Sequence, residues 1–132
     1  MRKIEHIGIA VKNLDVSNKL FARLLGVEHY KIETVESEGV RTSFFKMGDV
    51  KIELLEATRV DSPIARFIEK RGEGIHHIAF DVDDAQAAVD KLAAEFHPLN
   101  ATTKPGADDK IIAFLHPKST NGVLVEVCSD KK

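Results

Sequence analysis

The stretch Glu73-Gly74-Ile75-His76-His77-Ile78-Ala79-Phe80-Asp81-Val82 decides the fold of this chain. Its residues alternate in the way that is typical of a strand with one buried face. Ile78, Phe80 and Val82 form the apolar row, whereas His77 falls on the opposite face. The stretch is therefore predicted to be a half-buried strand that carries a histidine on its non-core face.

The same design occurs at the start of the chain, in Ile4-Glu5-His6-Ile7-Gly8-Ile9-Ala10-Val11. Here Ile7, Ile9 and Val11 form the apolar row, and His6 stands on the other side. Two strands of one design, whose histidines are 71 residues apart, indicate a duplicated unit.

Each histidine is followed by a second apolar strand that an acidic residue interrupts. These strands are Val50-Lys51-Ile52-Glu53-Leu54-Leu55 and Val123-Leu124-Val125-Glu126-Val127. A carboxylate inside so apolar a strand is costly unless it is paired or binds a metal ion. Glu53 and Glu126 therefore complete two matched pairs of candidate ligands.

The remaining elements follow the same duplicated order. The first half predicts strands at 3–11, 27–34, 40–47 and 50–55, with a helix capped at Asn13 or Asp15 and ended by Gly26. The apolar positions of this helix are Val16, Leu20, Phe21, Leu24 and Leu25. The second half predicts strands at 75–82, 99–103, 111–115 and 123–128, with a helix capped near Asp83 or Asp84 whose Val89, Leu92 and Phe96 face the sheet. A linker helix is predicted at about 61–72, with Ser62 as its cap and Pro63 at its first position.

These elements predict an α+β fold of one domain over residues 1–132. Its two tandem βαβββ modules, at about 1–58 and 73–129, are expected to form a curved mixed-sheet cup with the helices outside. Strand parity then points His6, Glu53, His77 and Glu126 into the cup.

Composition excludes several classes of protein. The net charge of −2 gives no reason to expect nucleic acid or an anionic membrane as partner. The single cysteine, Cys128, excludes an internal disulfide framework, and no apolar run approaches the length of a membrane span. A cytoplasmic protein is expected.

Two imidazoles and two carboxylates suit a divalent transition metal and leave open positions in a six-coordinate shell. A metal held in this way acts as a Lewis acid on a carbonyl and stabilises the enolate that forms when the neighbouring C–H is deprotonated. The other histidines are not expected to be ligands. His29 and His97 are expected to be solvated, His76 to pack or to support the site, and His116 to be structural or to border the substrate.

At these residues the chain resembles the vicinal oxygen chelate superfamily, to which glyoxalase I, extradiol dioxygenases and antibiotic-resistance proteins belong. Within it, the chain is most similar to the methylmalonyl-CoA epimerases. The resemblance covers nearly the whole chain and depends most on Asp61-Ser62-Pro63-Ile64-Ala65, on the double histidine at 76–77, and on His116-Pro117-Lys118.

The resemblance implies that His6, Glu53, His77 and Glu126 bind a divalent metal, with Co²⁺ favoured over Zn²⁺, Mn²⁺ or Ni²⁺. It implies interconversion of (R)- and (S)-methylmalonyl-CoA, an acyl-CoA substrate and a homodimer, and it implies no further cofactor. The alternatives are a glyoxalase I-type lactoylglutathione lyase and a metal-free binding protein of the antibiotic-resistance type. An extradiol dioxygenase would use two histidines and one carboxylate and would not need Glu53.

One position departs from the epimerase pattern. Thr42 stands where some bacterial epimerases carry a glutamate proposed as the base. Glu126 is the candidate base in its place, and Glu36 or Glu38 on the neighbouring loop are alternatives. Candidate contacts for the CoA phosphates are Lys104, Lys118, Arg66 and Arg71, although an ordinary solvated surface charge is the favoured explanation for any one of them.

Overall fold

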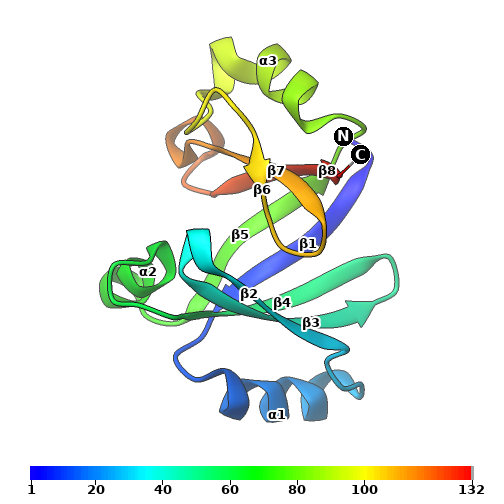
Figure 1. The fold of residues 1–132 in the computed structure, drawn as a ribbon, viewed down its shortest axis with the longest axis vertical. Coiled ribbons are helices and arrows are strands. Elements are labelled where there is room, and N and C mark those ends of the chain that lie inside the picture. Colours follow the sequence, from blue (N-terminus) through cyan, green and yellow to red (C-terminus); the bar gives the residue numbers. More distant parts are fainter. Residues whose placement is uncertain (132) are drawn as a thin grey trace. The chain divides into compact units, whose positions relative to one another are not determined.

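The computed structural model describes residues 1–131. Its elements are β1 (Lys3–Ala10), α1 (Leu14–Leu25), β2 (Lys31–Val35), β3 (Val40–Met47), β4 (Val50–Ala57), α2 (Pro63–Arg71), β5 (Gly74–Asp81), α3 (Ala85–Phe96), β6 (Lys104–Pro105), β7 (Lys110–Leu115) and β8 (Val125–Asp130) (Figure 1). Strands β5 and β8 run parallel, whereas β2–β3, β3–β4, β6–β7 and β7–β8 are antiparallel pairs. The predicted α+β class with two βαβββ modules and a mixed sheet is confirmed. Among residues 1–131, no helix is both long and apolar enough to cross a membrane.

The chain folds into two compact units whose boundaries pass through β1 and β5. The first, unit 1, contains Met1–His6 and His77–Lys132, and the second, unit 2, contains Ile7–His76. Because the boundary falls directly after His6 and directly before His77, both histidines of the repeated strand design belong to unit 1.

Unit 1 is a sheet in the order β1-β5-β8-β7-β6 with one helix on it. The start of the chain is held against β5 by the Arg2 N–H, which donates to the Asp81 carbonyl at 2.9 Å. Helix α3 packs on β7 and β8 (Figure 1). The core beneath it contains Val82, Ala85, Val89, Ala113 and Val127. Of the apolar residues on the predicted strands, Val82 and Val127 lie in this core, whereas Val123 is exposed.

Unit 2 is a sheet in the order β2-β3-β4-β1, with a helix on each face. Helix α1 covers a core of Val11, Leu14, Phe45 and Leu54. Helix α2 packs on the other face, where the core contains Ala10, Val40, Leu55 and Ile64. As predicted, Ser62 caps α2 by accepting a hydrogen bond from the Ala65 N–H, and Pro63 is its first residue.

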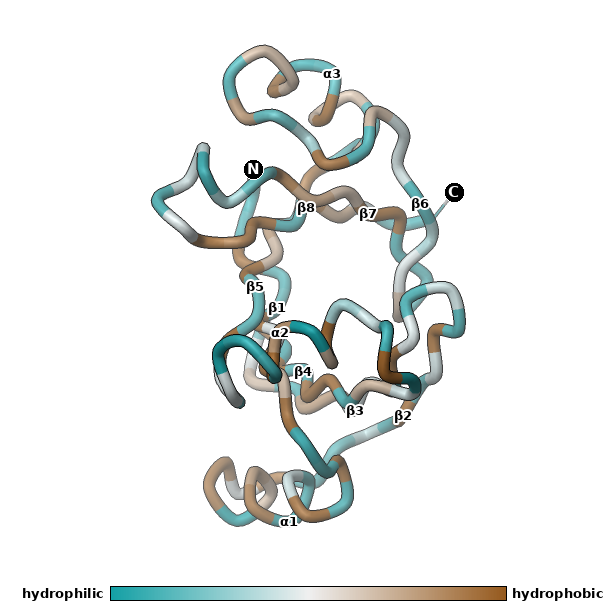
Figure 2. Tube along the Cα trace, turned by 90° about the vertical axis from the view of Figure 1, so that its left-hand side faces the viewer, coloured by the Kyte–Doolittle hydropathy of each residue, from teal (hydrophilic) through white to brown (hydrophobic). Residues whose placement is uncertain are grey.

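The buried face of α1 differs from its most apolar face. Leu14, Ser17 and Asn18 are buried, and Phe21 and Leu25 pack against the same core. The other apolar positions of the predicted helix, Val16, Leu20 and Leu24, are exposed. Small polar residues at 17 and 18 let the helix lie close to the sheet, so hydrophobicity alone does not set its rotation. Figure 2 accordingly shows both hydrophobic and hydrophilic segments along α1.

The structure departs most from the predicted strands at 27–34 and at 99–103. Strand β2 starts at Lys31 rather than at 27, after the left-handed Gly26 that ends α1. The segment 99–103 is not a strand, because the side chain of Gln86 in α3 satisfies its backbone. Gln86 Nε2 donates to the Ala101 carbonyl at 3.0 Å, and Gln86 Oε1 accepts from the Thr103 N–H at 2.9 Å.

Candidate metal centre

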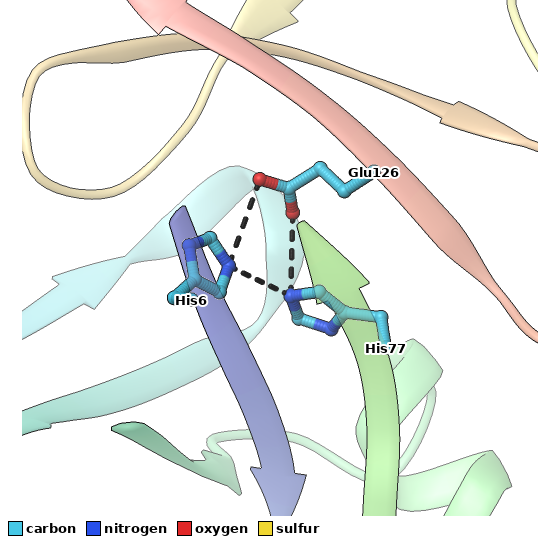
Figure 3. A group of neighbouring side chains, drawn as sticks. All are labelled: His6, His77 and Glu126. Atoms are coloured by element: carbon cyan, nitrogen blue, oxygen red, sulfur yellow. Dashed lines mark hydrogen bonds and ion pairs between the residues drawn. The ribbon is translucent and has the colours of Figure 1, made fainter. Parts of the chain in front are cut away.

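Three strands of unit 1 each supply one side chain to a buried polar cluster. His6 comes from β1, His77 from β5 and Glu126 from β8 (Figure 3). In the parallel pairing of β5 with β8, Glu126 is the partner of Ala79, two residues beyond His77. Side chains two residues apart share a face of a strand, so His77 and Glu126 become diagonal neighbours.

The donor atoms of these three residues converge. His6 Nε2 lies 2.9 Å from His77 Nε2. The carboxylate of Glu126 places one oxygen 3.3 Å from His77 Nε2 and the other 3.6 Å from His6 Nε2. Figure 3 shows the carboxylate directed at both imidazole rings. The exposed fractions are 5% for each histidine and 4% for Glu126, so the cluster is almost completely removed from water.

The spacing of the donors fits a metal ion. Two donor atoms that bind one ion at about 2.1 Å lie about 3.0 Å apart at a right angle and about 3.4 Å apart at a tetrahedral angle. The three observed separations, from 2.9 to 3.6 Å, fall close to these values. Imidazole nitrogen and carboxylate oxygen are ligands for zinc, cobalt, nickel and manganese. His6, His77 and Glu126 therefore form a candidate metal-binding group.

The surroundings of the cluster are apolar. The ring of Phe114 meets His77 edge to face, with 5.6 Å between centroids. Ala79, Ile112 and Cys128 form a buried core cluster, against which Phe114 packs. Burial and the charge of Glu126 raise the pKa of the Cys128 thiol, so this side chain stays a neutral packing residue instead of a thiolate ligand.

Glu5 is a residue that strand alternation did not identify as part of the site. Its Oε1 lies 2.6 Å from Nδ1 of His6, and both side chains are buried. Alternation assigns neighbouring residues to opposite faces, so period-two counting separates Glu5 from His6. A signal was nevertheless present, because an acidic residue precedes the histidine inside an otherwise apolar strand.

The sequence model of the Glyoxalase/Bleomycin resistance protein/Dioxygenase superfamily matches residues 5–114. This chain belongs to that superfamily. Its relatives within the superfamily include methylmalonyl-CoA epimerases. The mitochondrial methylmalonyl-CoA epimerase of Dictyostelium discoideum is 42% identical over 127 residues, which are 95% of this chain and 76% of that protein. The uncharacterized protein YqjC of Bacillus subtilis strain 168 is 40% identical over 132 residues, covering 99% of this chain and 94% of that one.

A solved structure of the same kind agrees over nearly the whole chain. A substituted form of Streptomyces coelicolor methylmalonyl-CoA epimerase, in complex with 2-nitronate-propionyl-CoA, matches with a TM-score of 0.95 at 34% identity. The match covers 98% of this chain and 95% of that chain. The predicted resemblance to the superfamily and to its epimerases is thereby confirmed.

Glu53 is the fourth predicted metal ligand, and it belongs to unit 2. It is 4% exposed and lies on β4 opposite Phe44 of β3. The ammonium of Lys51 is 3.9 Å from Glu53 Oε2, and that of Lys31 lies 4.9 Å from the centre of the Phe44 ring. Its role as a ligand stays a prediction.

Thr42 lies on β3 between Glu33 of β2 and Leu55 of β4. Its side chain is buried, and a hydroxyl does not serve as a base at neutral pH. The alternative bases Glu36 and Glu38 form a 3-10 turn that contains no buried residue.

The other histidines pack against aromatic rings, cap a turn or are exposed to solvent. His76 packs its ring against Phe67, and burial lowers its pKa to about 4, so it is neutral at pH 7. His116 accepts a hydrogen bond from the Lys118 N–H and thereby caps a 3-10 turn. His97 is exposed in a left-handed conformation, as expected of a solvated residue. His29 is half-buried and meets the ring of Phe45.

Proposed function

We propose that this protein is a metal-dependent epimerase that interconverts (R)- and (S)-methylmalonyl-CoA. The supporting observation is the convergence of two imidazole nitrogens and a carboxylate in a buried cluster of side chains, in a chain whose relatives include methylmalonyl-CoA epimerases. The substrate is carried over from these relatives, one of which binds an acyl-CoA analogue.

The metal shell in this proposal consists of His6, His77, Glu126 and Glu53. The internal repeat of the fold supports the fourth member. Glu53 is the cross-strand partner of Phe44, and Glu126 is the cross-strand partner of Phe114. Two neutral imidazoles and two carboxylates balance the charge of a divalent cation. Co²⁺ is the proposed ion, and Zn²⁺, Mn²⁺ and Ni²⁺ have ligand preferences that also fit.

A bound divalent cation supplies Lewis-acid stabilisation of the negative charge that develops on the thioester oxygen when the α-proton leaves. Among this chain's own residues, Glu126 is the proposed base, because its carboxylate is buried and meets both histidines. Ala79 and Phe114 are the cross-strand partners of Glu126 on β5 and β7, and in this proposal they limit the access of water to the site. Inversion then requires that a proton reach the opposite face of the planar enolate from a second donor or through a relay, and exchange of this proton with solvent brings deuterium into the α-position.

The test is incubation of purified protein with (S)-methylmalonyl-CoA and Co²⁺ in deuterated water. We expect deuterium to enter the α-position and the (R) form to accumulate, both dependent on the metal. His77→Ala is expected to abolish both signals, and Asp83→Asn, which changes an exposed carboxylate of unit 1, to leave both unchanged.

Absence of exchange and of epimerisation in the metal-loaded protein would show the proposal to be wrong. Turnover of the methylglyoxal–glutathione hemithioacetal under the same conditions would favour a lactoylglutathione lyase. The proposed homodimer is tested on the same preparation by light scattering after gel filtration, which should give twice the mass of one chain.

A further inference from the structure

One short polar contact of the candidate metal centre joins a proposed ligand, His6, to a residue outside the proposed ligand set, Glu5. Glu5 Oε1 lies 2.6 Å from His6 Nδ1, and the exposed fractions of the two residues are 7% and 5%. As a carboxylate, Glu5 can only accept a hydrogen bond, and in that state the proton in this contact is on Nδ1 of the imidazole.

The position of that proton decides what the opposite side of the ring offers. A neutral imidazole carries one N–H and one nitrogen with a free electron pair. With the proton on Nδ1, the electron pair is on Nε2, the atom that lies 2.9 Å from His77 Nε2. The other tautomer would place an N–H there, and this N–H would have to leave before Nε2 could bind a metal ion.

We propose that Glu5 is a positioning residue of the metal centre, holding His6 in the Nδ1–H tautomer with Nε2 free to bind the ion. This inference rests on the proposed function, since the ion is the one assigned to that site. Glu5 acts through His6 and does not itself contact substrate.

The contact has a second consequence for the ring. A short hydrogen bond to a charged acceptor is about twice as strong as a neutral one, so it limits rotation of the imidazole about its side-chain bonds. It also raises the basicity of the opposite nitrogen. Loss of such a partner weakens metal binding by about 10- to 100-fold in metal sites of this type.

Two variants separate these effects. Glu5→Leu removes the acceptor and keeps an apolar side chain of similar size, whereas Glu5→Gln keeps an acceptor oxygen and loses the charge. Asp83→Asn is the matched control, because the Asp83 side chain is 88% exposed in the same unit. Far-UV circular dichroism and urea unfolding establish that each variant is folded, and Glu5→Gln carries the test if Glu5→Leu is not.

The first measurement is the tautomer of His6 in metal-free protein at pH 8, read from long-range ¹H–¹⁵N correlation spectra of the imidazole. We expect Nδ1–H in the wild type and in Asp83→Asn, and its loss in Glu5→Leu. The second measurement is Co²⁺ affinity by chelator competition, followed through the visible absorption of the bound ion. We expect Kd to rise about 10- to 100-fold in Glu5→Leu and by less in Glu5→Gln.

An Nε2–H tautomer in the wild type, or a Glu5→Leu variant with wild-type tautomer and wild-type Kd, overturns the proposal. Failure of this inference can be told apart from failure of the proposed function. A wild-type protein that binds no Co²⁺ would contradict the metal-dependent epimerase. The tautomer would then still decide the role of Glu5, since its loss in Glu5→Leu supports positioning and its persistence refutes it.

Discussion

Two hairpins of this protein, β3–β4 in unit 2 and β7–β8 in unit 1, are built on the same plan. In the first, Phe44 is the partner of Glu53, and in the second, Phe114 is the partner of Glu126. A lysine ammonium lies over each phenylalanine ring, that of Lys31 at 4.9 Å and that of Lys104 at 5.8 Å from the centroid. The repeat has therefore preserved a lysine, an aromatic ring and a carboxylate across three neighbouring strands.

The hairpins differ four residues farther along. The pair at that register is Val40 and Ala57 in the first hairpin and Lys110 and Asp130 in the second. The apolar pair packs against α2 through Ile64, whereas the charged pair forms an ion pair at 2.6 Å with the Asp130 side chain exposed. The two hairpins thus share the residue type at the carboxylate position. Four residues farther along, the residues are apolar where α2 packs on the strands and charged where the side chain of Asp130 is exposed.

The environments of the two carboxylates also differ. Lys51 stands two residues before Glu53 and approaches it to 3.9 Å. The residue at the same place before Glu126 is Leu124, and Glu126 meets His6 and His77 instead. A lysine within its own unit offsets part of the charge of Glu53, so the two glutamates are expected to be chemically unequal.

The largest effect is expected for Glu126→Gln. Removal of a general base lowers the rate by about 10²- to 10⁴-fold, and Glu126 is both the proposed base and a proposed metal ligand. Deuterium exchange into methylmalonyl-CoA measures the rate, and elemental analysis measures the bound metal. A variant that retains a tenth or more of the wild-type rate would exclude Glu126 as the base.

The next largest effect is expected for Phe44→Ala, and it is an effect on stability. Compared with Phe114→Ala, this variant tests how the packing of the two hairpins differs. Phe44 is fully buried and Phe114 only partly so. We expect Phe44→Ala to lower the free energy of unfolding by about 3–5 kcal/mol, because truncation of a buried phenylalanine leaves a cavity. Urea unfolding of metal-free protein measures the loss, and Phe114→Ala is the matched variant. An equal or larger loss for Phe114→Ala would contradict the burial assigned to the two rings.

A smaller effect on activity is expected for Glu53→Gln. The amide oxygen still offers a ligand atom, so exchange should fall by less than about tenfold. The measurement is the ratio of its exchange rate to that of Glu126→Gln under one Co²⁺ concentration. If Glu53→Gln lowers the exchange rate as much as Glu126→Gln does, the two carboxylates act equivalently. That result would contradict the chemical difference that we attribute to Lys51.

The smallest effect is expected for Asp130→Asn. The hydrogen bond and the charge of Lys110 lower the pKa of Asp130. The ionised form is therefore favoured in the folded state, and its stabilisation is present above the ordinary pKa of 3.8 and lost as the pH falls through the lower folded value.

Because the pair is exposed, we expect Asp130→Asn to cost only a few tenths of a kcal/mol at pH 7. Urea unfolding in 0.05 M and 1 M NaCl measures this difference, which salt should largely remove. If Asp130→Asn lowers the free energy of unfolding by more than about 1 kcal/mol at both salt concentrations, the Lys110–Asp130 pair does not behave as an exposed ion pair. The contrast with the apolar Val40–Ala57 pair would then be wrong.

Sequence reasoning placed His6, His77 and Glu126 on one side of the sheet because alternation in a strand fixes which side chains share a face, and their donor atoms do meet in the structure. Their role as metal ligands stays a prediction. It missed Glu5, because a neighbouring side chain reached the ring from a position that alternation assigns to the opposite face. It also missed the rotation of α1, since burial of Ser17 and Asn18 depends on how close the helix lies to the sheet. The irregular segment at 99–103 depends on Gln86, a partner that no local pattern identifies.

By itself the sequence determined the duplicated strand design and the order of the elements, because period-two alternation is a local property, and its residue types predicted the chemical kind of site. Only the tertiary structure decided which donor atoms meet, and at what spacing. Distances such as the 2.9 Å between His6 Nε2 and His77 Nε2 depend on how three strands distant in the chain pair and twist. The proton on His6 is decided in the same way, because it depends on the side chain that reaches the far side of the ring.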